Sequence, residues 1–185
     1  MTEELDGTIT TLDEALDGDA EARGLLLERL RPRLCLWAST RLSPAIRAHV
    51  DPEDVTQEIL LAVHRGLDDF EARGEREFHA WVFRIAENRV RDLADYAGAK
   101  KRQAAPITPF SQTSPSTAAM KTETFTRVHR ALATLPEDHQ RVIRLRYLEE
   151  REVSEVAERM DRSENAVRIL YCRALKALKT ALPGD

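Results

Sequence analysis

The side chains best suited to catalysis in this sequence are carboxylates clustered at the start of a predicted helix. Glu53, Asp54 and Glu58 follow closely after Asp51. Neighbouring carboxylates can act as a general acid and base, but that chemistry requires a pocket and an opposing group. The sequence indicates neither, and it lacks a glycine-rich phosphate loop and a nucleophile motif. A carboxylate-based hydrolase is therefore the weakest of the three functions that we consider, and we predict that the chain is not an enzyme.

Metal and disulfide chemistry are not predicted either. The five histidines form no ligand pattern, and Cys35 and Cys172 lie far apart without the spacing of a metal motif. We interpret both cysteines as free thiols in a reducing cytoplasm, and we expect no metal and no cofactor. The sequence shows neither a basic-then-apolar leader pattern nor an apolar run long enough to cross a bilayer, so we expect no signal peptide and no membrane association.

Charge is distributed unevenly along the 185 residues. The formal net charge of −4 argues at first sight against nucleic-acid binding. Residues 1–99 carry 12 basic and 21 acidic side chains, however, whereas residues 123–185 carry 12 basic and 11 acidic ones. Segment 163–182 has four basic residues against the single acid Glu164. This asymmetry indicates a protein partner for the front half and nucleic acid for the last helix.

Helical patterns surround the acidic cluster. Asp51 is a suitable N-cap and Pro52 suits the first helical position. Two apolar stripes at helical spacing follow, separated by a charged connection: Val55, Ile59, Val63 and Leu67, then Phe78, Trp81, Val82, Ile85 and Ala86. The sequence does not decide between a core position and a partly exposed position for Trp81. Upstream, residues 20–42 predict a helix that Pro32 kinks or divides, and Ser43-Pro44 begins a short helical segment.

Residues 98–122 interrupt this pattern. They contain three prolines and several Ser and Thr residues, with little apolar periodicity. This composition predicts a flexible linker between domains at 1–97 and 123–185.

The last domain shows the pattern of a helix-turn-helix. A short helix over 153–160 is followed by a tight turn at Asp161-Arg162 and by a final helix that Ser163 caps. Apolar positions including Val167, Leu170 and Ala174 share one side of the final helix, and the opposite side carries Asn165, Arg168, Cys172 and Lys176. The first turns of such a helix meet base edges and later basic residues meet phosphates, so DNA binding is favoured over a merely solvated helix.

Two ordered sets of residues resemble a known family. Asp51-x-Glu53-Asp54-Val55-x-Gln57-Glu58 with Phe78-x-Ala80-Trp81-Val82-x-Arg84-Ile85-Ala86-x-Asn88-Arg89 resembles the second conserved region of bacterial sigma factors, in particular of the extracytoplasmic-function (ECF) group. Leu135-Pro136, Leu145-Arg146-Tyr147, Glu155-Val156-Ala157-Glu158 and Ala166-Val167-Arg168 resemble the fourth conserved region. The resemblance implies an all-α chain with a region 2 helical bundle and a region 4 helix-turn-helix, joined by the linker.

The resemblance also implies a function: binding to core RNA polymerase, recognition of promoter DNA, DNA melting and transcription initiation. It assigns core polymerase binding, at the clamp helices of the largest subunit, to Asp51, Glu53, Asp54, Gln57 and Glu58. It assigns the −10 element to Phe78, Trp81, Arg84, Asn88 and Arg89, and the −35 element to Ser163, Asn165, Arg168, Cys172, Arg173 and Lys176. The flap of the polymerase β subunit and an anti-sigma factor are further expected partners.

Some residues depart from the family pattern. Asp161 stands where the turn usually carries glycine, and Leu170 and Cys172 stand where a basic residue and a histidine are common. These departures leave the preferred −35 sequence open. The alternative function is a stand-alone helix-turn-helix regulator whose front domain binds a ligand or dimerises. Core polymerase discriminates between the two, because a regulator binds its operator alone.

Overall fold

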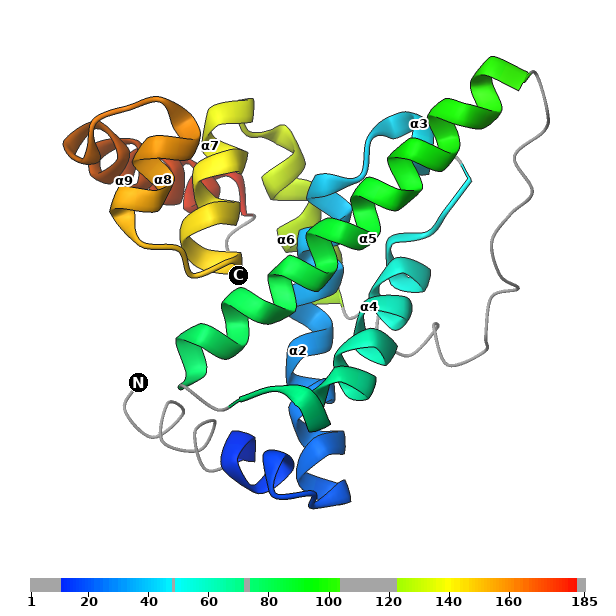
Figure 1. Cartoon of the computed structure of the whole chain (residues 1–185). Coiled ribbons are helices and arrows are strands. Elements are labelled where there is room, and N and C mark those ends of the chain that lie inside the picture. The colour runs from blue at the N-terminus through cyan, green and yellow to red at the C-terminus, as the bar shows by residue number, and fades with distance from the viewer. Residues whose placement is uncertain (1–10, 48, 72–73, 104–122, 183–185) are drawn as a thin grey trace. The chain divides into compact units, whose positions relative to one another are not determined.

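The computed structural model describes residues 11–47, 49–71, 74–103 and 123–182, and all regular elements within these ranges are helices. The chain forms two compact units, Met1–Thr113 and Ser114–Asp185 (Figure 1). The prediction of an all-α chain is confirmed. The first residues of the predicted linker, up to Gln103, continue a helix, and the others lie outside the described ranges.

The first unit is built on three long helices. They are α2 (Ala20–Arg41), α4 (Pro52–Gly66) and α5 (Glu75–Gln103), with the short helices α3 (Pro44–Arg47) and η1 (Leu67–Asp69) in the connections. Helix α4 packs against α2, and α5 crosses both (Figure 1). Helix α2 is continuous through the exposed Pro32, so this residue does not divide it. The carbonyl that proline leaves unpaired belongs to Glu28, another exposed residue on the solvent side of α2.

Apolar stripes from these helices meet in one core. Val55, Ile59 and Val63 of α4 are fully buried, as their four-residue spacing predicts. Trp37 of α2 and Phe83 of α5 are also fully buried, with ring centroids 5.8 Å apart. Packing in this core determines which faces of α2, α4 and α5 are exposed to solvent.

The second unit contains α6 (Glu123–Thr134), α7 (Glu137–Ile143), α8 (Val153–Met160) and α9 (Glu164–Ala181). A π-helical turn, η3 (Arg144–Leu148), extends α7. It leads to Glu149, whose buried carboxylate lies 2.6 Å from Nε of Arg151 and 3.7 Å from Nε of Arg144. Helix α9 packs against α6, α7 and α8, so one side of α9 belongs to the core and the other stays outside.

The turn between α8 and α9 is tight. Asp161 adopts the left-handed conformation with φ 52° and ψ 53°, and the N–H of Arg162 donates to the Ala157 carbonyl at 3.0 Å. Aspartate is one of the few residues besides glycine that enters this region with modest strain. Ser163 then caps α9 by accepting a hydrogen bond from the Ala166 N–H at 3.2 Å, as predicted.

Candidate polymerase and nucleic-acid interface

A groove of about 510 Å³ runs between α2 and α4. Gln57, Leu61 and His64 of α4 line it together with Glu28 and Arg31 of α2. Leu61 is 52% exposed within the groove, where a large apolar side chain offers a contact surface to another protein. Sequence reasoning identified Gln57 but missed Leu61, which lies four residues later on the same face of the helix.

The acidic residues at the start of α4 occupy different environments. Asp51 is exposed and accepts a hydrogen bond from the Glu53 N–H at 2.9 Å, which confirms the predicted cap. Asp54 is half-buried, and its pKa is raised by burial first and then by the negative charges of Asp51, Glu58 and Glu53. Asp51 and Asp54 therefore remain available to a partner at this end of α4.

Glu53 differs from what the sequence predicts, because it is only 8% exposed. Its carboxylate pairs with the Arg31 guanidinium of α2 at 2.9 Å, and this ion pair permits a charge in the interior. Burial, together with the hydrogen bond to Glu53 and its negative charge, raises the pKa of the neighbouring Cys35 thiol to about 12. Glu53 joins α2 to α4, and its neighbours Asp54 and Gln57 are more accessible to a partner.

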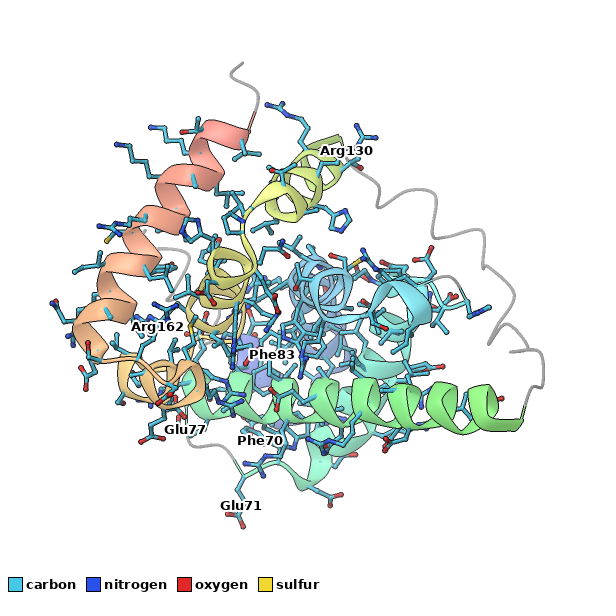
Figure 2. The ribbon with its side chains drawn as sticks, turned by 90° about the horizontal axis from the view of Figure 1, so that it is seen from above. Phe70, Glu71, Glu77, Phe83, Arg130 and Arg162 are labelled. Atoms are coloured by element: carbon cyan, nitrogen blue, oxygen red, sulfur yellow. The ribbon has the colours of Figure 1, made fainter. Side chains whose placement is uncertain are left out.

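An aromatic cluster lies where the η1 connection meets α5. The ring centroid of Phe70 lies 4.9 Å from that of Trp81 and 5.6 Å from that of Phe78. Trp81 is half-buried, whereas Phe78 is 1% exposed, so Phe78 supports the cluster from beneath and does not reach its surface. Phe70 is not among the residues that the resemblance assigns to the −10 element, although its place directly before the charged connection was a usable signal. Figure 2 shows Phe70 below α5 and the acidic Glu71 pointing away from the helices.

The outer face of α5 continues from Trp81 along the helix. Arg84 and Asn88 are exposed one and two turns later, and Arg91 donates to the Asn88 side-chain oxygen at 3.2 Å. Arg89 lies on another side, where its guanidinium pairs with Glu58 of α4. The structure therefore groups Trp81, Arg84 and Asn88 and separates Arg89 from them.

The exposed face of α9 brings together most of the residues predicted for the −35 element. Asn165, Cys172 and Lys176 share this face, with Arg168 and Arg173 at its two edges, and all five are exposed. Arg168 pairs with Glu164 one turn earlier at 2.7 Å, so this arginine already has a carboxylate partner. In the turn that precedes α9, Arg162 pairs with Asp138 of α7 at 2.6 Å.

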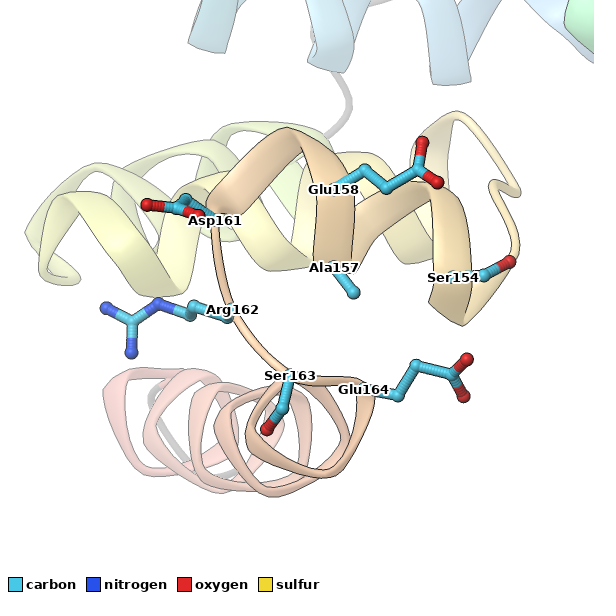
Figure 3. A pocket seen from close by; sticks show the side chains of 7 residues that line it. All are labelled: Ser154, Ala157, Glu158, Asp161, Arg162, Ser163 and Glu164. Atoms are coloured by element: carbon cyan, nitrogen blue, oxygen red, sulfur yellow. The ribbon is translucent and has the colours of Figure 1, made fainter.

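An open hollow of about 520 Å³ lies where α8 turns into α9. Ala157 and Glu158 of α8, the turn residues Asp161 and Arg162, and the start of α9 line it (Figure 3). In Figure 3 the Arg162 side chain points to one side, while Glu158 and Glu164 point to the other. Positive and negative side chains therefore lie on opposite sides of the first turn of α9.

Ile169 is a further exposed residue of α9, and sequence reasoning did not include it. It lies four residues after Asn165 and three before Cys172, near the middle of the exposed face. Its side chain is 45% exposed. It lies two residues after the buried Val167 and five before the buried Ala174, and on a helix this spacing indicates a side chain that faces outward.

Comparison with known proteins places these two units in sequence families. Residues 26–99 match the model of Sigma-70 region 2, and residues 131–180 match that of Sigma-70, region 4. The chain is 30% identical over 173 residues to the ECF RNA polymerase sigma factor ShbA of Streptomyces griseus, covering 89% of this chain and 90% of ShbA. The chain belongs to the ECF RNA polymerase sigma factors.

Two further similarities extend over nearly the whole sigma factor chain. SigD of Mycobacterium tuberculosis, another ECF RNA polymerase sigma factor, is 29% identical over 180 residues, which cover 96% of this chain and 83% of SigD. The structure of CnrH in complex with the cytosolic domain of CnrY aligns with a TM-score of 0.48 at 26% identity, covering 94% of this chain and 95% of that chain.

The matched regions coincide with the elements that carry the candidate surfaces. Region 2 includes most of α2, all of α4 and most of α5, and region 4 includes α7, α8 and nearly all of α9. Among the described residues of this sigma factor, no three His, Cys, Asp or Glu side chains are placed to hold a metal ion. Within the same ranges, no helix combines the length and apolar character that crossing a bilayer requires.

Proposed function

We propose that this sigma factor binds core RNA polymerase, reads the −35 element through α9, and holds the opened −10 element on α5. The observation that carries this proposal is the exposed face of α9, which follows a capped turn. Its first turns present Asn165 and Arg168, side chains suited to base edges, and its later turns present the phosphate-binding cations Arg173 and Lys176. Membership of the ECF family supports the role in transcription initiation.

Core polymerase is proposed to dock on the groove between α2 and α4, through the clamp helices of its largest subunit. Asp54, Gln57 and the exposed Leu61 provide acidic, polar and apolar contacts along one helix. Polar residues around an apolar centre are typical of a protein interface. Glu53 contributes by fixing α4 to α2 through Arg31. The flap of the β subunit and an anti-sigma factor remain further proposed partners.

The −10 element is proposed to bind along the outer face of α5. Melted DNA exposes bases that stack on aromatic rings, while nearby cations follow the phosphates. Trp81 is the half-buried aromatic at this face, and Arg84 and Asn88 extend it. Phe78 and Arg89 hold this surface from within, since the first supports the Trp81 ring and the second binds α4.

In vitro transcription with purified core enzyme on a promoter library tests the proposed function. We expect promoter-specific transcripts only when core enzyme and this chain are both present. Specific footprints should likewise require both proteins. A chain that binds one operator equally well without core enzyme is instead a stand-alone regulator.

The docking surface is tested separately by Asp54→Ala combined with Gln57→Ala. These substitutions should weaken binding to core enzyme while leaving helicity by circular dichroism unchanged. Asp17→Ala, which removes an exposed acid before α2, is the control for the change of one charge and should bind normally. Equal affinity for the double variant and the control would reject this docking surface.

A further inference from the structure

We infer that Ile169 is a specificity residue of α9 that packs against the C5-methyl group of a thymine in the −35 element. This inference rests on the proposed function, because it requires α9 to enter the major groove. It adds an apolar contact to a surface whose other candidate contacts are made by hydrogen-bonding and charged side chains.

The position of Ile169 on the helix supports this assignment. Asn165 precedes it by four residues and Cys172 follows it by three, so the three side chains lie on neighbouring turns of one face. Val167 and Ala174, at 1% and 0% exposure, mark the opposite, core-facing side. Ile169 also lies within the first two turns after the Ser163 cap, which is the part of a recognition helix that meets base edges.

The chemistry of the side chain selects the ligand. A sec-butyl group has no donor or acceptor, so it gains nothing from the polar edges of guanine, cytosine or adenine. Thymine alone presents a methyl group in the major groove, and apolar side chains recognise it by contact. Asn165, one turn earlier, is a side chain suited to an adenine edge, so the neighbouring turns fit a site that contains A·T pairs.

The surroundings of Ile169 favour DNA over a protein partner. The next exposed apolar residue of α9, Leu175 at 39% exposure, is six residues away and therefore on a different side of the helix. The residues around Ile169 on its own face are Asn165, Cys172, Arg173 and Lys176, so it is not part of a broad apolar patch. A protein interface would require such a patch, whereas one thymine methyl requires a single apolar side chain.

Thymine-to-deoxyuridine exchange tests the inference, because it removes only the methyl group and leaves base pairing intact. The complete chain with core polymerase is bound to a promoter that it transcribes, and each thymine of the −35 element is exchanged in turn. One exchange should weaken binding of the wild-type chain about fourfold, the value expected for one buried carbon. Ile169→Ala should bind the thymine promoter at least that much more weakly and lose its sensitivity to the exchange.

Leu175→Ala is the matched control, since it truncates an exposed apolar residue of the same helix about 120° around the helix from Ile169. It should retain the sensitivity to deoxyuridine. The inference fails if no exchange affects the wild-type chain, if Ile169→Ala keeps the sensitivity, or if the −35 element contains no thymine. Scrambling the −35 element separates the proposed function from the role of Ile169. If scrambling leaves promoter binding unchanged, the proposed function is overturned. If scrambling weakens binding but no deoxyuridine exchange does, only the role of Ile169 is overturned.

Discussion

The guanidinium of Arg89 in α5 is paired with the carboxylate of Glu58 in α4. The resemblance to sigma factors assigns these residues to different partners, Glu58 to polymerase and Arg89 to DNA. In the structure they neutralise each other across the contact between two helices. Their side chains are 29% and 32% exposed, so the pair is partly shielded from solvent.

We therefore predict that Arg89 acts mainly in stability and Arg84 in DNA binding. Arg89→Gln and Glu58→Gln should each lower the free energy of unfolding by up to about 1 kcal/mol, and the double variant should lose little more. Arg84→Gln should leave stability unchanged and reduce the salt dependence of promoter binding by about one phosphate contact. Urea denaturation and salt titration of the complex with core enzyme measure the two effects. If Arg89→Gln instead reduces the salt dependence of promoter binding, Arg89 contacts DNA as the family resemblance implies.

Asp54 should make stability depend on pH. Its pKa is raised in the folded state by burial and by Asp51, Glu58 and Glu53, so the folded chain binds its proton more tightly than the unfolded chain. The stabilising contribution of this proton is complete below the ordinary carboxyl pKa and is lost as the pH rises through the raised pKa. Asp54→Asn should therefore raise the melting temperature at pH 7 relative to wild type, and this gain should shrink at lower pH. A gain that is constant with pH would show that titration of Asp54 is not its cause.

Gly66 should be required for the packing of Trp81. A Cβ atom at Gly66 would lie 2.9 Å from Cζ2 of the Trp81 ring, closer than such atoms approach. We expect Gly66→Ala to displace the ring, change tryptophan fluorescence and lower the free energy of unfolding by about 1–3 kcal/mol.

Gly24 of α2 provides the matched control for this glycine. A Cβ there meets no atom within 4 Å, so Gly24→Ala should stabilise the chain by roughly 0.5–1 kcal/mol through helix propensity. If both variants have the same stability, the Gly66–Trp81 contact does not constrain the fold.

Arg168 and Glu164 should affect promoter binding in opposite directions. Their ion pair at 2.7 Å is exposed, and Glu164 competes with DNA for the Arg168 guanidinium. Arg168→Ala should weaken −35-dependent initiation by about 1–3 kcal/mol if it reads a base, with little change in melting temperature. Glu164→Gln should strengthen promoter binding, because it removes both a competing partner and a negative charge near the phosphates. Loss at one base pair indicates base reading, and equal loss on all −35 sequences indicates a phosphate contact; no effect on any of them would contradict a DNA contact.

Local signals in the sequence predicted much of this fold. The caps Asp51 and Ser163 and the buried spacing of Val55, Ile59 and Val63 depend on residues within a few positions of each other. The boundary at the end of α5 was less predictable. Gly98 suggested a break, but a single glycine costs a helix only about 1 kcal/mol, and α5 continues to Gln103.

Two ion pairs that sequence reasoning missed depend on distant residues. Glu53 looks like a solvent-exposed acid until Arg31, far earlier in the chain, is brought beside it. Arg89 follows the family motif of a DNA-binding residue until α4 places Glu58 against it. Ile169 differs, because its helical position was visible in the sequence; its exposure shows that the residue faces outward.

The two cysteines differ in a way that provides an experimental handle. Cys35 is buried with a pKa near 12, so almost none of its thiol is ionised at neutral pH, whereas Cys172 is exposed on α9. A maleimide dye should therefore react with the unmodified chain at Cys172 alone. Because Cys172 lies on the α9 face proposed to enter the major groove, a bulky label there should block −35 binding, and a chain without the label is its control.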